Sequence, residues 1–412
     1  MPEMTGTRTA SLVMPSATSR RLVVLAPETG HFMNLIDLPS AEKIVMKDVS
    51  ALRHGRIRPV MQRYGMIDFV ASAVRFALSL RRLSAEFAWT SAVTRQLEPC
   101  VALTDNTHLK FLGALGVRHP QTRVVAVQSG HQTERDLHSS RPSYLRSNGR
   151  GYQIGADTPP YHDVVLTWNQ YSINQLHDNG VKYRYACAVG SVMDALHQAR
   201  GITPGTPRSE LAIVLMKPRT FHFPDTIPYR VSQQHSRRVV YMYLRRYCDH
   251  HRLSPTMIMR ALDADCAQRQ QQDLHEVYGT DYTISDWSTR FGSYDAVMSA
   301  HVVVGDQSSL LVEALGRGRR ALSVTMSDDP SMQFPFPGPW ALQSPTYEQF
   351  ADRLDQIRGM SDQEWKTLVG DLPSQAIAQV SSVPAHRFVE RFVRHLLSGH
   401  SPERAEEMIR SA

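Results

Sequence analysis

The sequence predicts an α/β protein made of two Rossmann-like domains that face a central cleft, with additional helices at the C-terminus. Short apolar, β-branched segments alternate with helical stretches, which is the pattern of buried parallel strands. This alternation stops at a Gly- and Pro-rich segment, ARGITPGTPR at 199–208, and then starts again. The length of 412 residues also suits two domains of about 150–200 residues each.

The expected elements follow this pattern in order. Strands are predicted at 21–27, 43–49, 100–106, 123–130, 163–169 and 185–191, and, after the linker, at 211–217, 256–262, 282–285, 301–306 and 320–326. Helices are predicted at 67–93, 241–250, 293–299, 309–316 and from residue 384 onward. The domain boundaries are therefore placed at 21–200 and 208–380, with C-terminal helices over 384–412 and a disordered leader over 1–20.

Composition excludes several classes of protein. The formal charge of +7 and the pI near 9.3 favour anionic partners without choosing among nucleic acid, an acidic membrane surface and phosphorylated small molecules. No apolar run approaches the roughly 18–20 residues of a membrane-spanning helix. Four widely spaced cysteines without a CxxC pair argue against a disulfide scaffold and a zinc ribbon. Aromatic residues are not interleaved with basic clusters, which weighs against nucleic acid.

The leader over 1–20 is rich in Ser, Thr and Arg but has no apolar core of the kind that a secretory signal requires. We therefore expect a bacterial-type cytoplasmic protein. A mitochondrial presequence has a similar composition and stays open as the minority interpretation.

The strongest site motif lies in the second half, in HVVVGDQSSLLVEALGRG at 301–318. A buried strand ends there, and a helix is predicted to begin at Ser308 or Ser309, directly after Gln307. Free N–H groups and two hydroxyls at a helix N-terminus form an anion site of phosphate size. Glu313 follows Ser309 by four residues and is expected to accept ribose hydroxyls. The alternative is that one serine only caps the helix and that Glu313 is solvated.

Three basic residues follow or lie within neighbouring strands of the same half. Lys217 and Arg219 come after the apolar run LAIVLM at 211–216, and Arg260 lies in the strand at 256–262. Cations at strand ends neutralise phosphate oxygens, so these residues complete the predicted nucleotide site. Ordinary surface charge is the alternative, and it is stronger for Lys217 than for Arg260.

Polar residues also follow two strands of the first half and mark a second rim of the cleft. Asp105, His131 and Glu134 are the candidates for deprotonating an acceptor hydroxyl. Asn106, Gln128 and Gly130 are placed on the acceptor side, Gly130 because its backbone permits a close approach to a ligand. For each residue taken singly, loop polarity is the simpler interpretation.

Several motifs are absent or not informative. There is no GxxxxGK[ST] and no GxGxxG, which disfavours P-loop and dinucleotide chemistry. The chain has 18 histidines but no HExxH, so a catalytic zinc is not expected. A DxD triplet at 263–265 has the form of a metal-binding motif, but such a triplet is expected about once by chance in this chain and is not counted as a site. No metal and no other cofactor is predicted.

Several segments of the chain resemble those of a known family. In the first half they are TDN at 104–106, VVAVQSG at 124–130, DVVLTW at 163–168 and VGS at 189–191. Those of the second half are SYDAVMSAHVVVGDQSSLLVEALGRG at 293–318, FPFPGPW at 334–340 and MSDQEW at 360–365. The chain resembles bacterial surface-carbohydrate biosynthesis proteins of the GT-B glycosyltransferase architecture, and more distantly the polymer-forming glycerophosphotransferases. Ser129, where relatives often have Asn, and His131 depart from the pattern on the acceptor side.

The resemblance implies a nucleotide-activated sugar held mainly by the second domain, without an obligatory metal. It places the donor phosphates on Ser308 and Ser309 and the nucleotide on Glu313. The expected function is transfer of a sugar from a CMP-, UDP-, GDP- or dTDP-linked donor to a growing surface glycan of the capsule or O-antigen type, free or lipid-linked. The alternatives are a non-catalytic glycan-assembly scaffold and a polyol-phosphate transferase of related fold.

Contact with the inner face of the membrane is a further question. The predicted helix at 67–93 carries Arg75, Arg81 and Arg82 near a strong apolar face, as a peripheral membrane helix does. Packing in the core is the more frequent outcome for such a helix.

Overall fold

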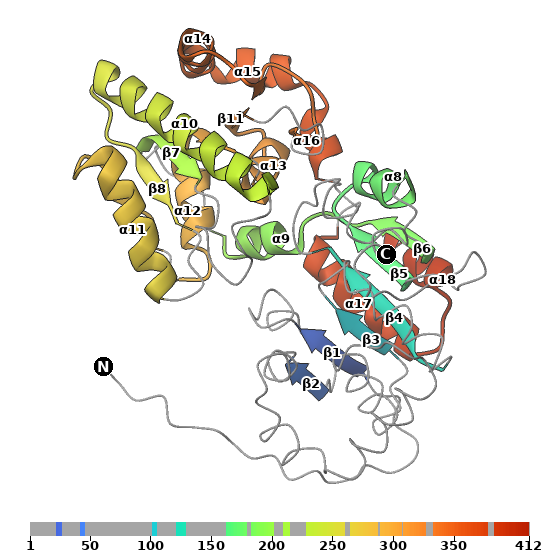
Figure 1. Cartoon of the computed structure of the whole chain (residues 1–412). Coiled ribbons are helices and arrows are strands. Elements are labelled where there is room, and N and C mark those ends of the chain that lie inside the picture. The colour runs from blue at the N-terminus through green and yellow to red at the C-terminus, as the bar shows by residue number, and fades with distance from the viewer. Residues whose placement is uncertain are drawn as a thin grey trace.

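The computed structural model contains two parallel β-sheets with helices around them (Figure 1). It describes residues 22–26, 42–45, 101–104, 121–128, 162–178, 183–201, 209–214, 228–259, 264–286, 289–306, 308–326, 333–377 and 383–411. The predicted helix at 67–93 lies outside these ranges. Among the described helices, none has both the length and the apolarity that crossing a bilayer requires.

The first sheet has six parallel strands in the order β2-β1-β3-β4-β5-β6. They are β1 (Leu22–Ala26), β2 (Glu42–Val45), β3 (Val101–Thr104), β4 (Arg123–Val127), β5 (His162–Thr167) and β6 (Tyr183–Ala188). The described side chains of β3 and β4 are almost all buried. Continuous apolar runs of this kind are typical of parallel strands that are covered on both faces, and all six predicted strands are confirmed.

The second sheet also has six parallel strands, in the order β12-β11-β10-β7-β8-β9. They are β7 (Ser209–Val214), β8 (Thr256–Ile258), β9 (Thr283–Ile284), β10 (Ala300–Gly305), β11 (Arg320–Thr325) and β12 (Ala341–Gln343). The first five match the predicted strands. The short edge strand β12 was not predicted, because a three-residue, half-exposed segment has no apolar run.

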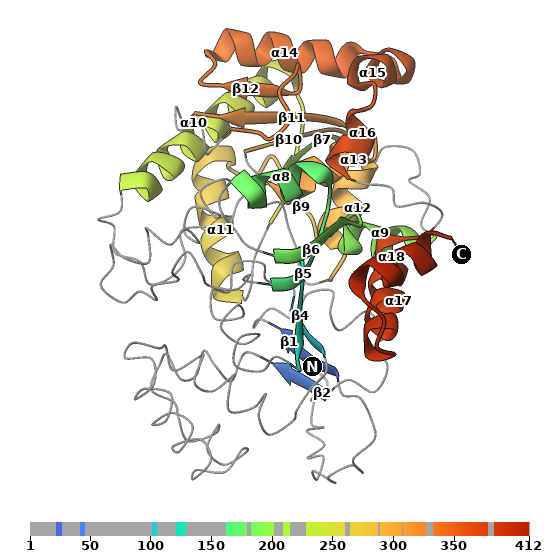
Figure 2. The same cartoon turned by 90° about the vertical axis from the view of Figure 1, so that its right-hand side faces the viewer.

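Helices cover both faces of the second sheet (Figure 2). The helices α10 (Pro228–His251) and α14 (Tyr347–Gly359) pack on one face, and α11 (Ala264–Tyr278) lies against α10. The opposite face carries α12 (Gly292–Ser299) and α13 (Ser309–Gly316). The chain continues through α15 (Asp362–Val369) and α16 (Leu372–Ala376), and α16 packs on α13.

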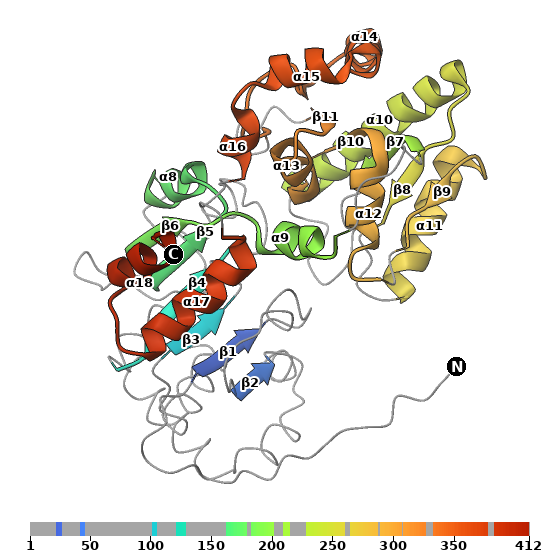
Figure 3. The ribbon, with the colours of Figure 1, turned by 180° about the vertical axis from the view of Figure 1, so that it is seen from behind.

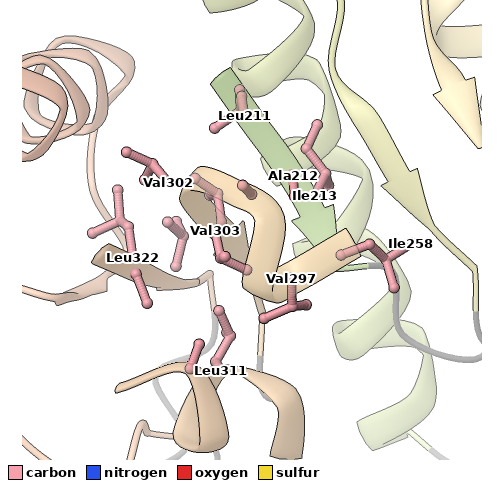
Figure 4. Close-up of a cluster of buried hydrophobic side chains, with 14 of the residues drawn as sticks. Leu211, Ala212, Ile213, Ile258, Val297, Val302, Val303, Leu311 and Leu322 are labelled. Carbon is pink, nitrogen blue, oxygen red and sulfur yellow. The ribbon is translucent and has the colours of Figure 1, made fainter. Parts of the chain in front are cut away.

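The core of this half forms where α12 and α13 meet the sheet (Figure 4). Side chains of the central strands β7 and β10, such as Ile213 and Val303, are completely buried together with Val297 of α12 and Leu311 of α13. Burial of a large aliphatic side chain contributes about 1.5–3 kcal/mol. This packing fixes both helices on the sheet, and with them the start of α13 at the end of β10.

The last two helices return to the first sheet. The helices α17 (Ala385–Leu397) and α18 (Pro402–Arg410) pack on each other, and α17 lies over β3 (Figure 3). Phe388 and Phe392 of α17 are buried in the same cluster as Val101 and Leu103 of β3. The predicted C-terminal helices are therefore confirmed. In the described part of the first half, the hydrophobic core is formed by side chains of the first sheet together with those of the C-terminal helices.

The helices α8 (Gln170–Asp178) and α9 (Val192–Ala199) stand between the halves. Figure 1 shows α9 (green) between the first sheet and α12 of the second half. The helix follows β6 and precedes the segment that was predicted as the linker, of which residues 202–208 lie outside the described ranges.

Candidate functional site

The predicted helix start at the end of β10 is confirmed by the structure. Ser308 is the N-cap of α13, with extended backbone angles (φ −130°, ψ 137°), and its hydroxyl accepts a hydrogen bond from the N–H of Leu310 at 3.3 Å. Ser309 is the first helical residue. Because β10 is parallel to its neighbours, this helix start lies at the carboxyl edge of the sheet, where α/β domains bind ligands.

Glu313 lies one turn further along α13 and is only 1% exposed. Its Oε1 accepts hydrogen bonds from the hydroxyls of Ser191 (2.5 Å) and Tyr294 (2.8 Å), and its Oε2 accepts from Tyr294 (2.9 Å). Ser191 belongs to the first half of the chain and Tyr294 to α12. The solvated alternative for Glu313 is therefore wrong. A ribose hydroxyl reaches this carboxyl only where these two hydroxyls share it or move away, so the nucleotide contact stays a prediction.

Burial raises the pKa of Glu313 from 4.5 to about 8. The nearby Asp194 carboxylate acts in the same direction, whereas the hydroxyls of Ser191 and Tyr294 and the Arg317 guanidinium lower the pKa. Because the carboxyl is fully enclosed, desolvation outweighs the hydrogen bonds and the guanidinium charge that lower the pKa. At neutral pH, Glu313 is therefore mostly protonated.

Ion pairs continue the contact between α9 and the second half. Arg317 Nε lies 2.6 Å from Asp194 Oδ1, and its Nη2 donates to the backbone oxygen of Asp194 at 2.9 Å. His197 Nε2 lies 2.8 Å from Asp295 Oδ1, and Arg200 donates to both oxygens of Asp295 at 3.1 and 3.2 Å. We call this set the α9 junction. It consists of Ser191, Asp194, His197 and Arg200 on one side and Tyr294, Asp295, Glu313 and Arg317 on the other.

A second connection lies at the carboxyl end of β5. The backbone N–H of Trp168 donates to Gln128 Oε1 at 2.9 Å, and the Trp168 indole donates to the Gln128 carbonyl at 3.0 Å. The next residue, Asn169, donates to the carbonyl of Ala376 in α16 at 2.6 Å. Gln128 was predicted on the acceptor side, and it is 2% exposed. Its two hydrogen bonds with Trp168 tie β4 to the end of β5, and its acceptor role stays a prediction.

The remaining predicted site residues lie outside the described ranges. They are Asp105, Asn106, Gly130, His131 and Glu134 in the first half and Lys217, Arg219, Arg260 and Gln307 in the second. The strands before them are described: β3 and β4 are neighbours in the first sheet, and β7 lies between β8 and β10 in the second. The carboxyl ends of these neighbouring parallel strands lie at one edge of each sheet. Whether the residues that follow them cluster there stays a prediction.

Sequence reasoning missed most of the α9 junction. Ser191, Asp194, Tyr294 and Arg317 were not singled out as site residues, although Ser191, Tyr294 and Arg317 lie in segments that carry the resemblance. A signal was present in Ser191 and Asp194, because Ser-x-x-Asp after a strand is typical of a helix start. Ser191 indeed caps α9 and accepts from the Asp194 N–H at 3.1 Å.

Metal and thiol chemistry have little structural support in the described part of the chain. There, no three His, Cys, Asp or Glu side chains converge as a metal site would require. Cys187 and Cys248 are buried free thiols, and burial raises the pKa of both. Independence of metal stays a prediction.

Comparisons with known proteins agree with this architecture. Residues 219–379 match the model of a family described as "putative O-antigen biosynthesis protein". A search of curated proteins gave no match.

Among solved structures, the chain is similar to the S. aureus MnaA–UDP co-structure, with a TM-score of 0.53, 9% identity and coverage of 92% of this chain and 97% of that one. It is also similar to the Methanocaldococcus jannaschii UDP-GlcNAc 2-epimerase in complex with UDP-GlcNAc and UDP, with a TM-score of 0.52, 9% identity and coverage of 92% of this chain and 100% of that one. A Listeria monocytogenes structure described as a "putative UDP-N-acetylglucosamine 2-epimerase" has a TM-score of 0.54, 12% identity and coverage of 94% of this chain and 98% of that one.

At these identities the likeness establishes the fold, two Rossmann-like domains of GT-B type, as the sequence predicted. The family match over residues 219–379 bears out the resemblance to bacterial surface-carbohydrate biosynthesis proteins of this architecture.

Proposed function

We propose that the chain is a glycosyltransferase that moves a sugar from a nucleotide-activated donor to a growing bacterial surface glycan. The observation that carries this proposal is the capped start of α13 at the carboxyl edge of the second sheet, within the residues that match an O-antigen biosynthesis family. A GT-B pair of domains supplies the second rim on which an acceptor is bound.

The phosphate part of the donor lies at the start of α13 in this proposal. The N-terminal N–H groups and the positive end of the helix dipole favour a negative charge there, and Ser309 adds a hydroxyl. Arg260, Lys217 and Arg219 neutralise the phosphate oxygens as the bond to the sugar breaks. Stabilisation of the leaving group by fixed donors and cations lowers the barrier to transfer, so no metal ion is required.

The acceptor side belongs to the first domain. One of Asp105, His131 and Glu134 accepts the proton of the attacking hydroxyl, while Asn106, Gln128 and Gly130 shape the rim. The acceptor is a glycan or a lipid-linked glycan, and the protein acts in the cytoplasm or at the inner face of the membrane. Flotation with anionic liposomes in low salt tests membrane contact, and protein that stays at the bottom rejects it.

Nucleotide release tests the reaction. The full chain is incubated with CMP-, UDP-, GDP- and dTDP-linked sugars, with and without a glycan extract, and the freed nucleotide is measured with and without EDTA. We expect acceptor-dependent release with one donor class, unaffected by EDTA. Ser309→Ala weakens it, whereas Arg391→Ala, an exposed residue of α17, leaves it unchanged. No release with any donor and extract rejects transfer, and nucleotide binding without release favours a non-catalytic scaffold.

A second candidate is epimerisation of a UDP-sugar at C2. Its support is that the three solved structures above, two of which are UDP-N-acetylglucosamine 2-epimerases by title, match over almost the whole length of both chains. Proton NMR of UDP-GlcNAc with the protein and no acceptor separates the candidates. A new UDP-linked sugar without free UDP supports epimerisation, and unchanged UDP-GlcNAc rejects it.

A further inference from the structure

A polar groove runs along α12 on the second half of the chain. Its volume is about 660 Å³, within the range of small-molecule sites, about 300–1,000 Å³. One wall is a single face of α12, formed by Gly292, Asp295, Ala296 and Ser299, which recur at the spacing of successive helical turns. We call this cavity the α12 groove. It shares no residue with the predicted donor site at Ser308, Ser309 and Glu313.

Another part of the lining comes from β8 and β9, the last two strands at one edge of the sheet. Thr256 of β8 and Thr283 of β9 lie side by side, and their hydroxyl oxygens are 2.9 Å apart. Ser285 follows β9 on the same side and is 7% exposed, and its hydroxyl has no hydrogen-bond partner among the described residues. An unsatisfied buried hydroxyl is costly, so the Ser285 hydroxyl favours a polar partner at this wall of the groove.

One end of the groove is held firmly. Arg200 binds both oxygens of Asp295 and lies over the Phe291 ring at 4.9 Å. A Cβ on Gly292 would lie 1.7 Å from the carbonyl oxygen of Asp286, so only glycine permits this close approach of the turn to α12. The wall is therefore in place before a ligand arrives, which reduces the entropic cost of binding.

The charges in the groove are balanced. Two guanidinium groups, of Arg200 and Arg290, face two carboxylates, of Asp286 and Asp295. Arg290 is exposed and makes no ion pair or hydrogen bond within the described part of the chain, so its donors are available. A free phosphate gains little here because the two carboxylates repel it. A neutral ligand that both donates and accepts can bind Arg290 and add hydrogen bonds to the carboxylate oxygens without a net charge penalty.

We propose that the α12 groove binds a short saccharide. Sugar hydroxyls donate to carboxylates and accept from guanidinium and hydroxyl groups at the same time, and the C–H face of a sugar ring packs on an aromatic ring such as Phe291. The groove then holds a segment of glycan apart from the reaction centre. This proposal does not rest on sugar transfer, because it also applies if the chain is an epimerase.

Calorimetric titration of the full chain with chitotriose, maltotriose and mannotriose tests the proposal. We expect at least one trisaccharide to bind, with Ser285→Ala and Arg290→Ala each weakening the affinity at least fivefold. Arg391→Ala, the same change at an exposed site on another helix, leaves the affinity unchanged. Circular dichroism confirms that each variant is folded.

Titration of the same preparations with UDP separates this site from the donor site. We expect the two groove variants to keep the UDP affinity of the unmodified chain, and UDP not to displace the saccharide. The proposal is overturned if no trisaccharide binds, if both groove variants bind as the unmodified chain does, or if UDP competes with the sugar. If a trisaccharide binds the unmodified chain but none of CMP, UDP, GDP and dTDP does, the proposed function is rejected and saccharide binding stands.

Discussion

Replacement of Glu313 by Gln tests the most unusual group of the α9 junction. The carboxyl is fully enclosed, and the nearest positive charge, on Arg317, is already paired with Asp194. Glutamine keeps the shape and the hydrogen-bonding oxygen but cannot ionise, so it imitates the protonated form. If Glu313 is protonated at neutral pH, E313Q retains most of the stability of the unmodified chain there.

The magnitude follows from the pKa. A shift from 4.5 to about 8 corresponds to about 5 kcal/mol between the charged and neutral forms, at 1.36 kcal/mol per pKa unit. Because the folded-state pKa is the higher one, the folded state holds the proton more tightly than the unfolded state. The associated stability is complete below pH 4.5 and is lost as the pH rises to about 8.

Urea unfolding of both proteins at several pH values measures this effect. Between pH 5.5 and 8.5 the free energy of unfolding of the unmodified chain should fall by about 3 kcal/mol relative to E313Q. The ionisation of Asp194, whose pKa burial also raises, is present in both proteins and largely cancels in the difference. Parallel pH profiles for the two proteins would refute the reasoning, since they would mean that Glu313 is charged throughout.

Three further substitutions test the packing and capping on which the site depends. Ser308→Ala removes the cap of α13 and should lower the free energy of unfolding by about 1 kcal/mol; no change in a urea titration would contradict the capping role. Arg317→Ala leaves the buried Asp194 carboxylate unpaired and should cost about 3–5 kcal/mol, part of which a second change, Asp194→Asn, recovers in a double-mutant cycle. Phe392→Ala empties a fully buried position between α17 and the first sheet and should cost about 3–5 kcal/mol; a loss below 1 kcal/mol would mean that α17 is not part of that core.

The strands were predictable because burial on both faces leaves a local signature. A run such as HVVVGD at 301–306 must be apolar to lie in the middle of a covered parallel sheet. The start of α13 was predictable from local sequence as well, since two serines follow the strand after only two residues. By contrast, α10 begins at Pro228, well before the predicted residue 241, because its first turns carry polar residues without apolar periodicity.

The surroundings of Glu313 were not predictable. Its position one turn after Ser309 follows from helix geometry, but its burial depends on Ser191, which is 122 residues away in the chain, and on Tyr294 of another helix. No local pattern specifies such a partner. The same holds for α17, whose apolar face predicts a helix and a covered side but not that the cover is the first sheet.

The Glu313 carboxyl is the point at which the predicted donor site meets the α9 junction. Under the proposed function a ribose hydroxyl and the hydroxyls of Ser191 and Tyr294 require the same two oxygens. Ser191 caps α9, the helix that connects the first half of the chain to the second. A ligand that takes these oxygens therefore weakens one contact between the halves, and any change that weakens the contact makes the oxygens easier to reach. By thermodynamic linkage the two effects have equal size. Under the proposed function, residues at the start of α9 therefore influence donor affinity without touching the donor.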